Sequence, residues 1–293
     1  MEGLSVIIPC YNEKDSLNNV LTAILAELEK LSLPREIIIV DDASTDGSLD
    51  TISGYGDKGV KVVKSKIRRG YGASLKAGLR SAKYDLVAIT DADGTYPAEM
   101  LPVMVRQLLD NDVDMVVGAR VKAGAKIPII RRPAKWMINR LAEYLAGRKI
   151  PDVNSGLRVM RKNIVEKFLN ILPDGFSFTT TITLAMMTNN YLVEYLPVDY
   201  YQRSGKSKFK AISDTLKFIQ LILRTVVYFN PLKVFVPASM LFFLLSFILL
   251  LYRIIMGKGF MVVSILLFIS ATQLLAIGAL ADLIDKRDVM GRK

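Results

Sequence analysis

Residues 36–48 read EIIIVDDASTDGS, an apolar run that ends in two aspartates and continues into turn-forming residues. A continuous run of this kind is typical of a parallel strand that is covered on both faces. Similar runs recur before residue 120, and the segments between them have helical spacing. We predict strands at Leu4–Pro9, Glu36–Val40, Val60–Lys64, Leu86–Thr90 and Met115–Gly118, and helices at 12–31, 45–53, 72–82 and 97–111. This alternation predicts an α/β fold with a mostly parallel, doubly wound sheet.

Carboxylates follow three of the predicted strands: Glu13 after the first, Asp41 and Asp42 after the second, Asp91 and Asp93 after the fourth. Taken singly, each loop also fits helix capping and turn formation. Together they place like charges along the sheet edge where α/β proteins bind ligands, which costs stability unless a cation or ligand is bound. Asp91 and Asp93 can both approach one Mg²⁺ that also holds a diphosphate.

The amino-acid composition excludes several kinds of catalytic and metal-binding site. The 293 residues include no histidine and a single cysteine, Cys10. A disulfide within the chain, a zinc site built from His and Cys, and Ser-His-Asp or Cys-His triads are therefore excluded. A bound metal must sit on oxygen ligands, which favours Mg²⁺ or Mn²⁺.

A glycine-rich stretch, residues 69–75 (RGYGASL), precedes the helix predicted at 72–82. Leu75 stands where a dinucleotide-binding fingerprint needs its last glycine, and the stretch is not a Walker A loop either. We expect it to let the backbone approach a nucleotide, with Lys76 or Arg69 near phosphate.

Two long uncharged runs lie near the C-terminus, at 234–252 and 260–281. At about 1.5 Å per residue they reach roughly 29 and 33 Å, enough to cross a hydrocarbon core of about 30 Å. More Lys and Arg flank the outer ends of the pair than the short connection, so the positive-inside rule places both termini in the cytosol. The N-terminus lacks the basic region of a signal peptide. We expect a multi-pass protein of the cell membrane with a cytosolic catalytic domain.

The net charge of +11 is unevenly distributed. Residues 120–149 carry +8 and residues 203–233 carry +6, which leaves −3 for the rest of the chain. Both stretches interleave bases with large apolar residues, a pattern typical of helices lying in a lipid headgroup layer. A solvated basic face remains an alternative for 120–149, and no nucleic-acid-binding module accompanies the charge. We therefore expect the bilayer as a partner and no nucleic acid; a homo-oligomer stays open.

The expected organisation has four parts. A catalytic domain spans 1–210, amphipathic juxtamembrane helices span 211–232, two transmembrane helices occupy 233–285, and a basic cytosolic tail spans 286–293.

Several motifs occur in an order that resembles glycosyltransferase family two, whose members have the GT-A fold, a Rossmann-like, mostly parallel sheet. They are Ser5–Glu13, Val40–Gly47 and Asp91–Gly94. Two further segments, Asn154–Arg158 and Arg203–Phe209, resemble the branch that glycosylates polyprenyl phosphates, such as dolichyl-phosphate mannose synthase.

The resemblance implies a role for each matching position. The donor nucleotide would be held by Pro9, Tyr11, Glu13, Val40, Asp42, Asp91 and Ala92. The metal would be held by Asp91 and principally Asp93, with Thr95 where relatives often carry Gln. The acceptor phosphate would contact Arg120, Arg131, Arg132 and Ser207, and the catalytic set would be Asp93, Arg120, Arg203 and Lys208. Lys135 departs from the serine that is often found at its position.

The implied activity is inverting transfer of a hexose, mannose or glucose first, from a GDP- or UDP-sugar to a polyprenyl (dolichyl) phosphate. A lipid phosphate is already ionised at neutral pH, so the absence of histidine is no obstacle to its attack. Two alternatives stay open. A processive polysaccharide synthase would need a Q-x-x-R-W motif, yet the only tryptophan, Trp136, follows Ala134-Lys135. The other is a non-catalytic membrane scaffold.

Overall fold

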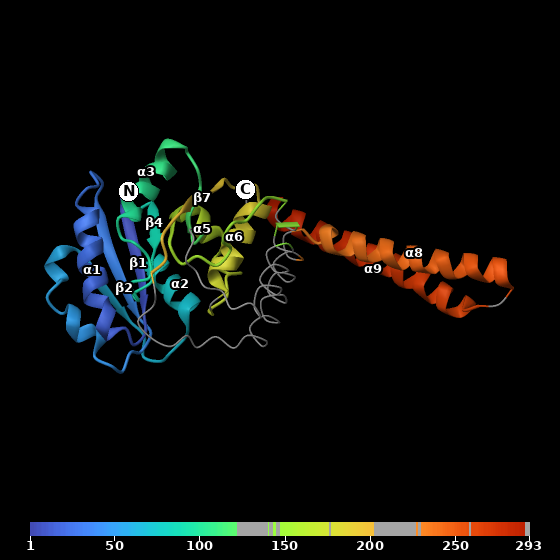
Figure 1. Cartoon of the computed structure of the whole chain (residues 1–293), viewed down its shortest axis with the longest axis horizontal. Coiled ribbons are helices and arrows are strands. Elements are labelled where there is room, and N and C mark those ends of the chain that lie inside the picture. Colours follow the sequence, from blue (N-terminus) through green and yellow to red (C-terminus); the bar gives the residue numbers. More distant parts are fainter. Residues whose placement is uncertain are drawn as a thin grey trace.

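The computed structural model of the chain consists of an α/β domain and a projecting pair of long helices (Figure 1). The structure describes residues 1–121, 140, 143–144, 147–175, 177–201, 227, 230–257 and 259–290. Most of the amphipathic segment predicted at 211–232 lies outside these residues.

Seven strands form one sheet in the order β3-β2-β1-β4-β6-β5-β7. The five predicted strands are all present, and each end lies within one residue of its predicted position: β1 (Leu4–Cys10), β2 (Arg35–Asp41), β3 (Val60–Lys64), β4 (Leu86–Ile89) and β5 (Met115–Ala119). β1 runs parallel to β2 and β4, and β2 runs parallel to β3. The predicted α/β fold with a mostly parallel sheet is confirmed.

Two strands that the sequence did not reveal complete the sheet. β6 (Arg158–Arg161) runs antiparallel between β4 and β5, and β7 (Val193–Pro197) runs parallel to β5. β6 has only four residues and both ends are arginine. Its strand character therefore comes from pairing with two neighbours rather than from an apolar run of its own.

Helices cover both faces of the sheet. α1 (Lys14–Leu28) and α3 (Met100–Asp110) pack on one face with Val6 and Ile8. α2 (Tyr71–Ser81), α5 (Lys162–Phe168) and α6 (Phe178–Thr188) pack on the other with Ile7. Successive strand residues point to opposite faces, so strands covered on both faces must be apolar throughout. This explains the continuous runs in the sequence.

The structure departs from the helix predictions at 45–53, shortens the helix predicted at 12–31 to α1, and adds α5 and α6. The segment expected as an α-helix at 45–53 is a short 3₁₀-helix, η1 (Ser48–Ile52), and a second one, η2 (Gly56–Lys58), precedes β3. The sequence did not reveal α6, which is buried on nearly all sides and includes four buried threonines. The hydroxyl of Thr183, for example, donates to the carbonyl of Thr179 at 2.8 Å. A helix without an exposed polar face has no apolar–polar period to detect.

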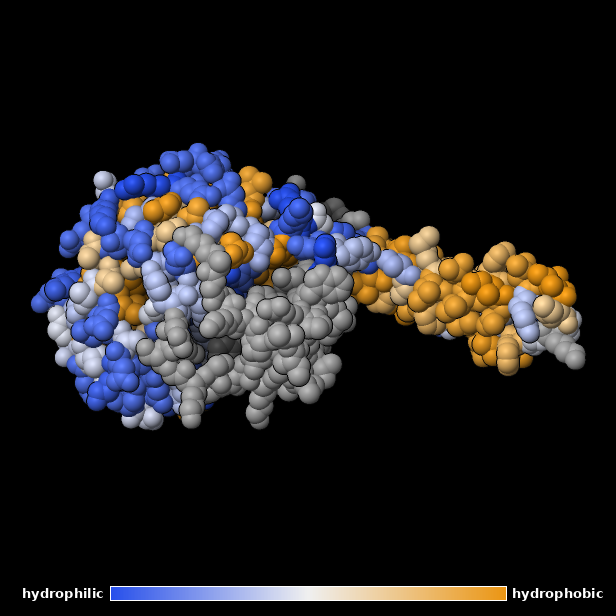
Figure 2. All heavy atoms as spheres, viewed as in Figure 1, coloured by the Kyte–Doolittle hydropathy of each residue, from blue (hydrophilic) through white to orange (hydrophobic). Residues whose placement is uncertain are grey.

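The C-terminal helices, α8 (Leu232–Met256) and α9 (Met261–Met290), form an antiparallel hairpin that projects from the domain (Figure 1). Mean hydropathies of 2.6 and 2.2 make both apolar enough to cross a membrane. Their large apolar side chains point outward, as Figure 2 shows; Leu244 and Phe268 are 55% and 54% exposed. Serines face inward, where the hydroxyls of Ser246 and Ser264 each donate to the other residue's carbonyl at 2.8 Å.

Candidate active site at the carboxyl edge of the sheet

The loops that follow β1, β2 and β4 are bound to one another, as their positions in the sheet predict. The backbone N–H of Asn12 donates to Ser44 Oγ at 3.0 Å, and Asn12 Oδ1 accepts from the N–H of Thr45 at 2.8 Å. The hydroxyl of Ser16 donates to the carbonyl of Ala92 at 2.8 Å. The three strand ends therefore form one surface.

Asp41 and Asp42 are buried and shape the loops around them. Asp42 accepts hydrogen bonds from the backbone N–H groups of Arg69 and Gly70 at 2.7 and 2.8 Å, and Asp41 accepts from Ser44. These contacts are structural, because they hold the loop after β3 against the loop after β2. A nucleotide-binding role for Asp42 stays a prediction.

The glycine-rich stretch packs closely against another part of the chain, and its expected approach to a nucleotide stays a prediction. A Cβ on Gly72 would lie 2.2 Å from the carbonyl oxygen of Pro173, and one on Gly70 would lie 2.8 Å from that of Asp174. Lys76 Nζ pairs with Asp174 at 2.7 Å. The glycines thus allow the backbone of residues 173–175 to approach the start of α2, and Lys76 pairs with Asp174 beside them.

The loop after β4 carries the predicted metal ligands. Asp93 Oδ1 accepts from both the hydroxyl and the backbone N–H of Thr95, at 2.7 and 3.1 Å. Thr95 itself is fully buried. The Thr95 hydroxyl therefore orients the Asp93 carboxylate, whether or not Thr95 also contacts a cation.

Asp91 is held from two sides. The hydroxyl of Tyr71 donates to Asp91 Oδ1 at 3.1 Å, and a Cβ on Gly156 would lie 2.7 Å from Oδ2. Burial and the neighbouring Asp91 carboxylate raise the pKa of Tyr71 well above its ordinary value. Tyr71 therefore remains a hydrogen-bond donor to Asp91 at neutral pH.

Tyr96 joins the loop after β4 to the segment before β6. Because residues 91–95 of this loop include the predicted metal ligands, we call it the metal loop. Its hydroxyl oxygen accepts from the backbone N–H of Gly156 at 2.7 Å. Burial, together with Asp91, raises the pKa of Tyr96 to about 12. The Asn154–Arg158 motif thus packs directly against Asp91 and Tyr96.

Arg120, a predicted catalytic and acceptor-binding residue, is bound by Asp152. Its Nε and Nη2 donate to the two carboxylate oxygens at 2.7 and 2.9 Å, and its guanidinium lies 5.2 Å from the ring centre of Tyr200. Burial opposes ionisation of Asp152, but the hydrogen bonds and charge of Arg120 outweigh it and lower the pKa of Asp152. The sequence did not reveal Asp152, since a lone aspartate carries no motif.

The other predicted donor-site residues line the same edge in different ways. The guanidinium of Arg68 lies 4.0 Å from the ring centre of Tyr11. Val40 and Ala92 are buried. Pro9 pairs with Val40 across β1 and β2, and the N–H of Glu13 donates to Ser48 Oγ at 3.0 Å.

Arg158 supports this arrangement from inside the protein. It is fully buried, and its guanidinium donates to the carbonyls of Ser155 and Val153 at 2.8 and 3.1 Å and to the hydroxyl of Thr183 at 2.7 Å. The motif containing Arg158 was visible in the sequence, but its role as a strut for residues 153–155 was not.

The remaining predicted site residues lie outside the described part of the chain: Arg131, Arg132, Arg203, Ser207 and Lys208. The described chain leads up to the segment that holds three of them, Arg203, Ser207 and Lys208. The backbone N–H of Tyr201 donates to the carbonyl of Thr95 at 2.9 Å, so residue 201 is attached to the metal loop.

The residues present fit a divalent cation that is shared with a substrate. Mg²⁺ is commonly held by one or two carboxylates together with substrate phosphates and water. Asp91 and Asp93 are half-buried and supply oxygen ligands from a single loop. Among the residues that the structure describes, no group of three or more His, Cys, Asp or Glu is placed to hold a metal ion by itself.

Comparison with known proteins identifies the family. The Glycosyl transferase family 2 model matches residues 5–169, and the GtrB C-terminal hairpin model matches residues 230–286. The chain belongs to glycosyl transferase family 2. The predicted family and enzyme class, glycosyltransferase, are confirmed.

Similar curated proteins transfer sugars to polyprenyl phosphates. The undecaprenyl-phosphate 4-deoxy-4-formamido-L-arabinose transferase of Serratia proteamaculans is 29% identical over 301 residues, covering 98% of this chain and 89% of that protein. The dodecaprenyl-phosphate galacturonate synthase of Rhizobium johnstonii is 26% identical over 300 residues, covering 97% and 88%. The dolichyl-phosphate hexose transferase of Haloferax volcanii is 27% identical over 208 residues, covering 71% and 86%.

Solved structures share the fold. Glucosyl-3-phosphoglycerate synthase from Mycobacterium tuberculosis, in complex with Mn²⁺, UDP-glucose and phosphoglyceric acid, aligns with a TM-score of 0.62 at 17% identity. The alignment covers 77% of this chain and 80% of that one. It supports the GT-A fold of this family 2 domain.

Proposed function

We propose that this glycosyltransferase moves a hexose from a nucleotide sugar to a polyprenyl phosphate and releases a nucleoside diphosphate. One observation carries the proposal: the loop with Asp91 and Asp93 is hydrogen-bonded through Thr95 to Tyr201. Tyr201 directly precedes the segment that contains the predicted phosphate-binding residues Arg203, Ser207 and Lys208. The named activities of the similar proteins support a polyprenyl phosphate as the acceptor. Mannose or glucose is the sugar to test first, from either a GDP or a UDP donor.

The chemistry asks the protein mainly to hold charges in place. A divalent cation, Mg²⁺ or Mn²⁺, would be held by Asp91 and Asp93 and would neutralise charge on the leaving diphosphate. Thr95 and Tyr71 orient these two carboxylates by donating hydrogen bonds to them. We assign Arg203 and Lys208 to the phosphates, because positive groups that hold two anionic reactants together lower the barrier by proximity and charge stabilisation.

The acceptor needs no general base, since its phosphate oxygen is ionised at neutral pH. Direct displacement at the anomeric carbon would invert its configuration, so an α-linked donor would give a β-linked lipid phosphosugar. Arg120 is positioned by Asp152 for contact with donor or acceptor phosphate in this scheme.

We further propose that the hairpin of α8 and α9 spans the cell membrane with both termini and the catalytic domain in the cytosol. The hydropathy of the two helices and the basic residues flanking their outer ends support this orientation. The catalytic edge then meets a lipid acceptor at the membrane surface.

The deciding experiment incubates the purified full-length protein with Mg²⁺ or Mn²⁺, a panel of radiolabelled nucleotide sugars and a short-chain polyprenyl phosphate. We expect one donor to give an organic-extractable labelled lipid, EDTA to abolish its formation, and NMR of the product to show inversion. If every donor fails to label lipid while the protein still binds nucleotide, the transferase proposal is wrong.

A further inference from the structure

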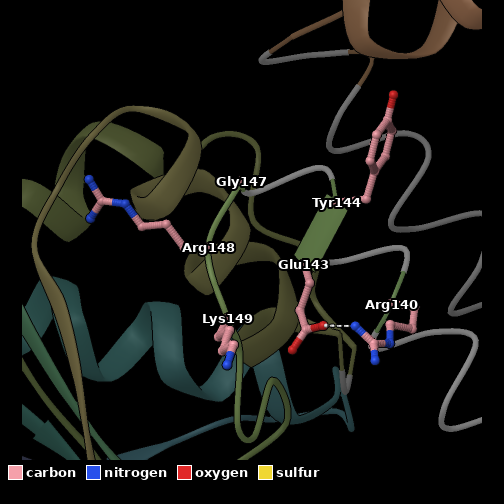
Figure 3. Close-up of a pocket in the computed structure, with 6 residues that line it drawn as sticks. All are labelled: Arg140, Glu143, Tyr144, Gly147, Arg148 and Lys149. Carbon is pink, nitrogen blue, oxygen red and sulfur yellow. Dashed lines mark ion pairs between the residues drawn. The ribbon is translucent and has the colours of Figure 1, made fainter.

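The junction between the α/β domain and the hairpin carries a pocket that the proposed reaction does not use. Its volume is about 510 Å³, and it is lined by Arg140, Glu143, Tyr144, Gly147, Arg148 and Lys149 (Figure 3). We call it the junction pocket.

A turn at Gly147 builds one wall of the junction pocket. Gly147 adopts a left-handed conformation with φ of +69°, and its N–H donates to the carbonyl of Glu143 at 2.8 Å. The N–H of Ile150 donates to Glu143 Oε1 at 3.3 Å, and the side chain of Ile150 is buried in the domain. Because the turn is held at both ends, it presents the exposed side chains of Arg148 and Lys149 at a defined place.

The charge of the junction pocket is strongly positive. Arg140 pairs with Glu143 at 3.6 Å (Figure 3). Lys233 adds a further cation, because a Cβ on Gly147 would lie 3.5 Å from Lys233 Nζ. Among the described residues, the pocket therefore has one carboxylate, Glu143, and four cations: Arg140, Arg148, Lys149 and Lys233.

The location of the junction pocket matches the expected membrane surface. Lys233 is in the first turn of α8, and the 19 residues after it carry no charge. Val234 packs on the buried cluster of Ile150, Val153, Leu184 and Met187, which fixes the pocket relative to the hairpin. Tyr144 is 57% exposed, and tyrosine is enriched at membrane–water interfaces.

We propose that the junction pocket binds the phosphate headgroup of an anionic bilayer phospholipid, at a site separate from that of the acceptor. The proposal rests on the membrane insertion of the hairpin proposed above. Basic residues beside an uncharged span attract anionic headgroups. In Figure 3 Arg148 and Tyr144 extend away from the ion pair, so the polar side chains are spread apart, which suits a headgroup at a membrane surface better than an enclosed small molecule. The acceptor phosphate, by contrast, must reach the loop of Asp91 and Asp93.

The test uses the full-length protein in a neutral detergent and follows its unfolding temperature. Dioctanoyl-phosphatidylglycerol should raise this temperature, and dioctanoyl-phosphatidylcholine and inorganic phosphate should not. In the double variant Arg148→Gln/Lys149→Gln the apparent affinity for phosphatidylglycerol should fall roughly 25-fold, because each basic residue near an anionic surface contributes about fivefold. Lys149→Gln alone should lose about fivefold and serves if the double variant does not fold.

The matched control removes two exposed lysines far along the sequence from the junction, Lys58 and Lys61, as Lys58→Gln/Lys61→Gln. It should bind phosphatidylglycerol like the wild type. Equal stabilisation by phosphatidylcholine, or by inorganic phosphate, would overturn the proposal. So would a raised KM for polyprenyl phosphate in the Arg148→Gln/Lys149→Gln variant without phosphatidylglycerol, because the pocket would then belong to the acceptor site. Phosphatidylglycerol binding is measured without donor or acceptor, so it can succeed even if the transferase proposal fails.

Discussion

The metal loop and the helical hairpin arrange their polar groups in opposite ways. Around Asp91 and Asp93, the hydroxyls of Tyr71 and Thr95 fix charged groups that remain half-exposed. In the hairpin, Ser246 and Ser264 are buried between the helices while large apolar side chains point outward. The same hydrogen-bonding chemistry thus positions reactive charge in one region and fixes helix register in the other. The difference follows from the surroundings that each region is built for, water or hydrocarbon.

The largest effect is expected at the metal loop itself. Asp93→Ala removes the carboxylate that Thr95 orients and should lower lipid labelling by about 10³-fold, the scale seen when one preorganised electrostatic contact is lost. Asp57→Ala, in the exposed η2 helix, is the control and should keep wild-type activity. Wild-type rates for Asp93→Ala would remove this residue from the mechanism.

A second variant, with a smaller expected loss of activity, tests the packing of Gly156 against Asp91. Gly156→Ala places a Cβ 2.7 Å from Asp91 Oδ2, so the carboxylate must move. Misplacement of a catalytic group by about 1 Å can cost about 10²-fold in rate, and we expect a loss of that order in kcat with an unchanged unfolding temperature. Gly54→Ala, whose Cβ meets nothing within 4 Å, is the matched control. An unchanged kcat for Gly156→Ala would show that Asp91 tolerates displacement.

The hairpin side of the comparison is tested with Ser246→Val/Ser264→Val. This change removes both hydroxyls that cross between α8 and α9, and it should lower stability by about 1–2 kcal/mol in detergent. Thermal unfolding measures the loss. Thr272→Val serves as the control, because the Thr272 hydroxyl donates within its own helix, to the carbonyl of Ile269. If both variants lose the same stability, the two serines do not join the helices.

The smallest expected effect has the opposite sign. Tyr195 has a buried hydroxyl without a hydrogen-bond partner among the described residues. Tyr195→Phe should therefore stabilise the domain, by up to about 1 kcal/mol, because an unpaired buried polar group carries a desolvation penalty. Tyr96→Phe, which loses the hydrogen bond from Gly156, should instead destabilise it. A lower unfolding temperature for Tyr195→Phe would mean that its hydroxyl is bonded in solution.

Local pattern was sufficient for the first five strands of the sheet, but not for β6 or for β7, which runs parallel to β5. Of the first five strands, β1, β2, β4 and β5 are largely continuous apolar runs, because helices cover them on both faces, whereas β3 is a mostly exposed edge strand that contains two lysines. The antiparallel strand β6 escaped prediction because its four residues acquire strand geometry only between β4 and β5. Helix α6 escaped because burial on nearly all sides removes the period on which helix prediction depends.

The residues of the candidate site also divide into those that the sequence predicted and those whose contacts only the structure identified. Asp91 and Asp93 were predictable because carboxylates beyond adjacent parallel strands must meet at one edge. The glycines at 70 and 72 predicted a close approach of backbone, but a glycine does not say what approaches. Here residues about a hundred positions later, 173–175, make that approach.

The sequence by itself determined the parallel α/β domain, the acidic strand ends and the two apolar helices. Each of these follows from a local property of the chain: its periodicity, its composition or the length of an apolar run. Only the tertiary structure decided the partners: Asp152 for Arg120, Thr95 for Asp93 and for Tyr201, and Gly156 against Asp91. Most of these contacts join segments far apart in the chain. Hydrogen bonds and close packing depend on distance and angle in space, and spacing along the sequence does not encode them.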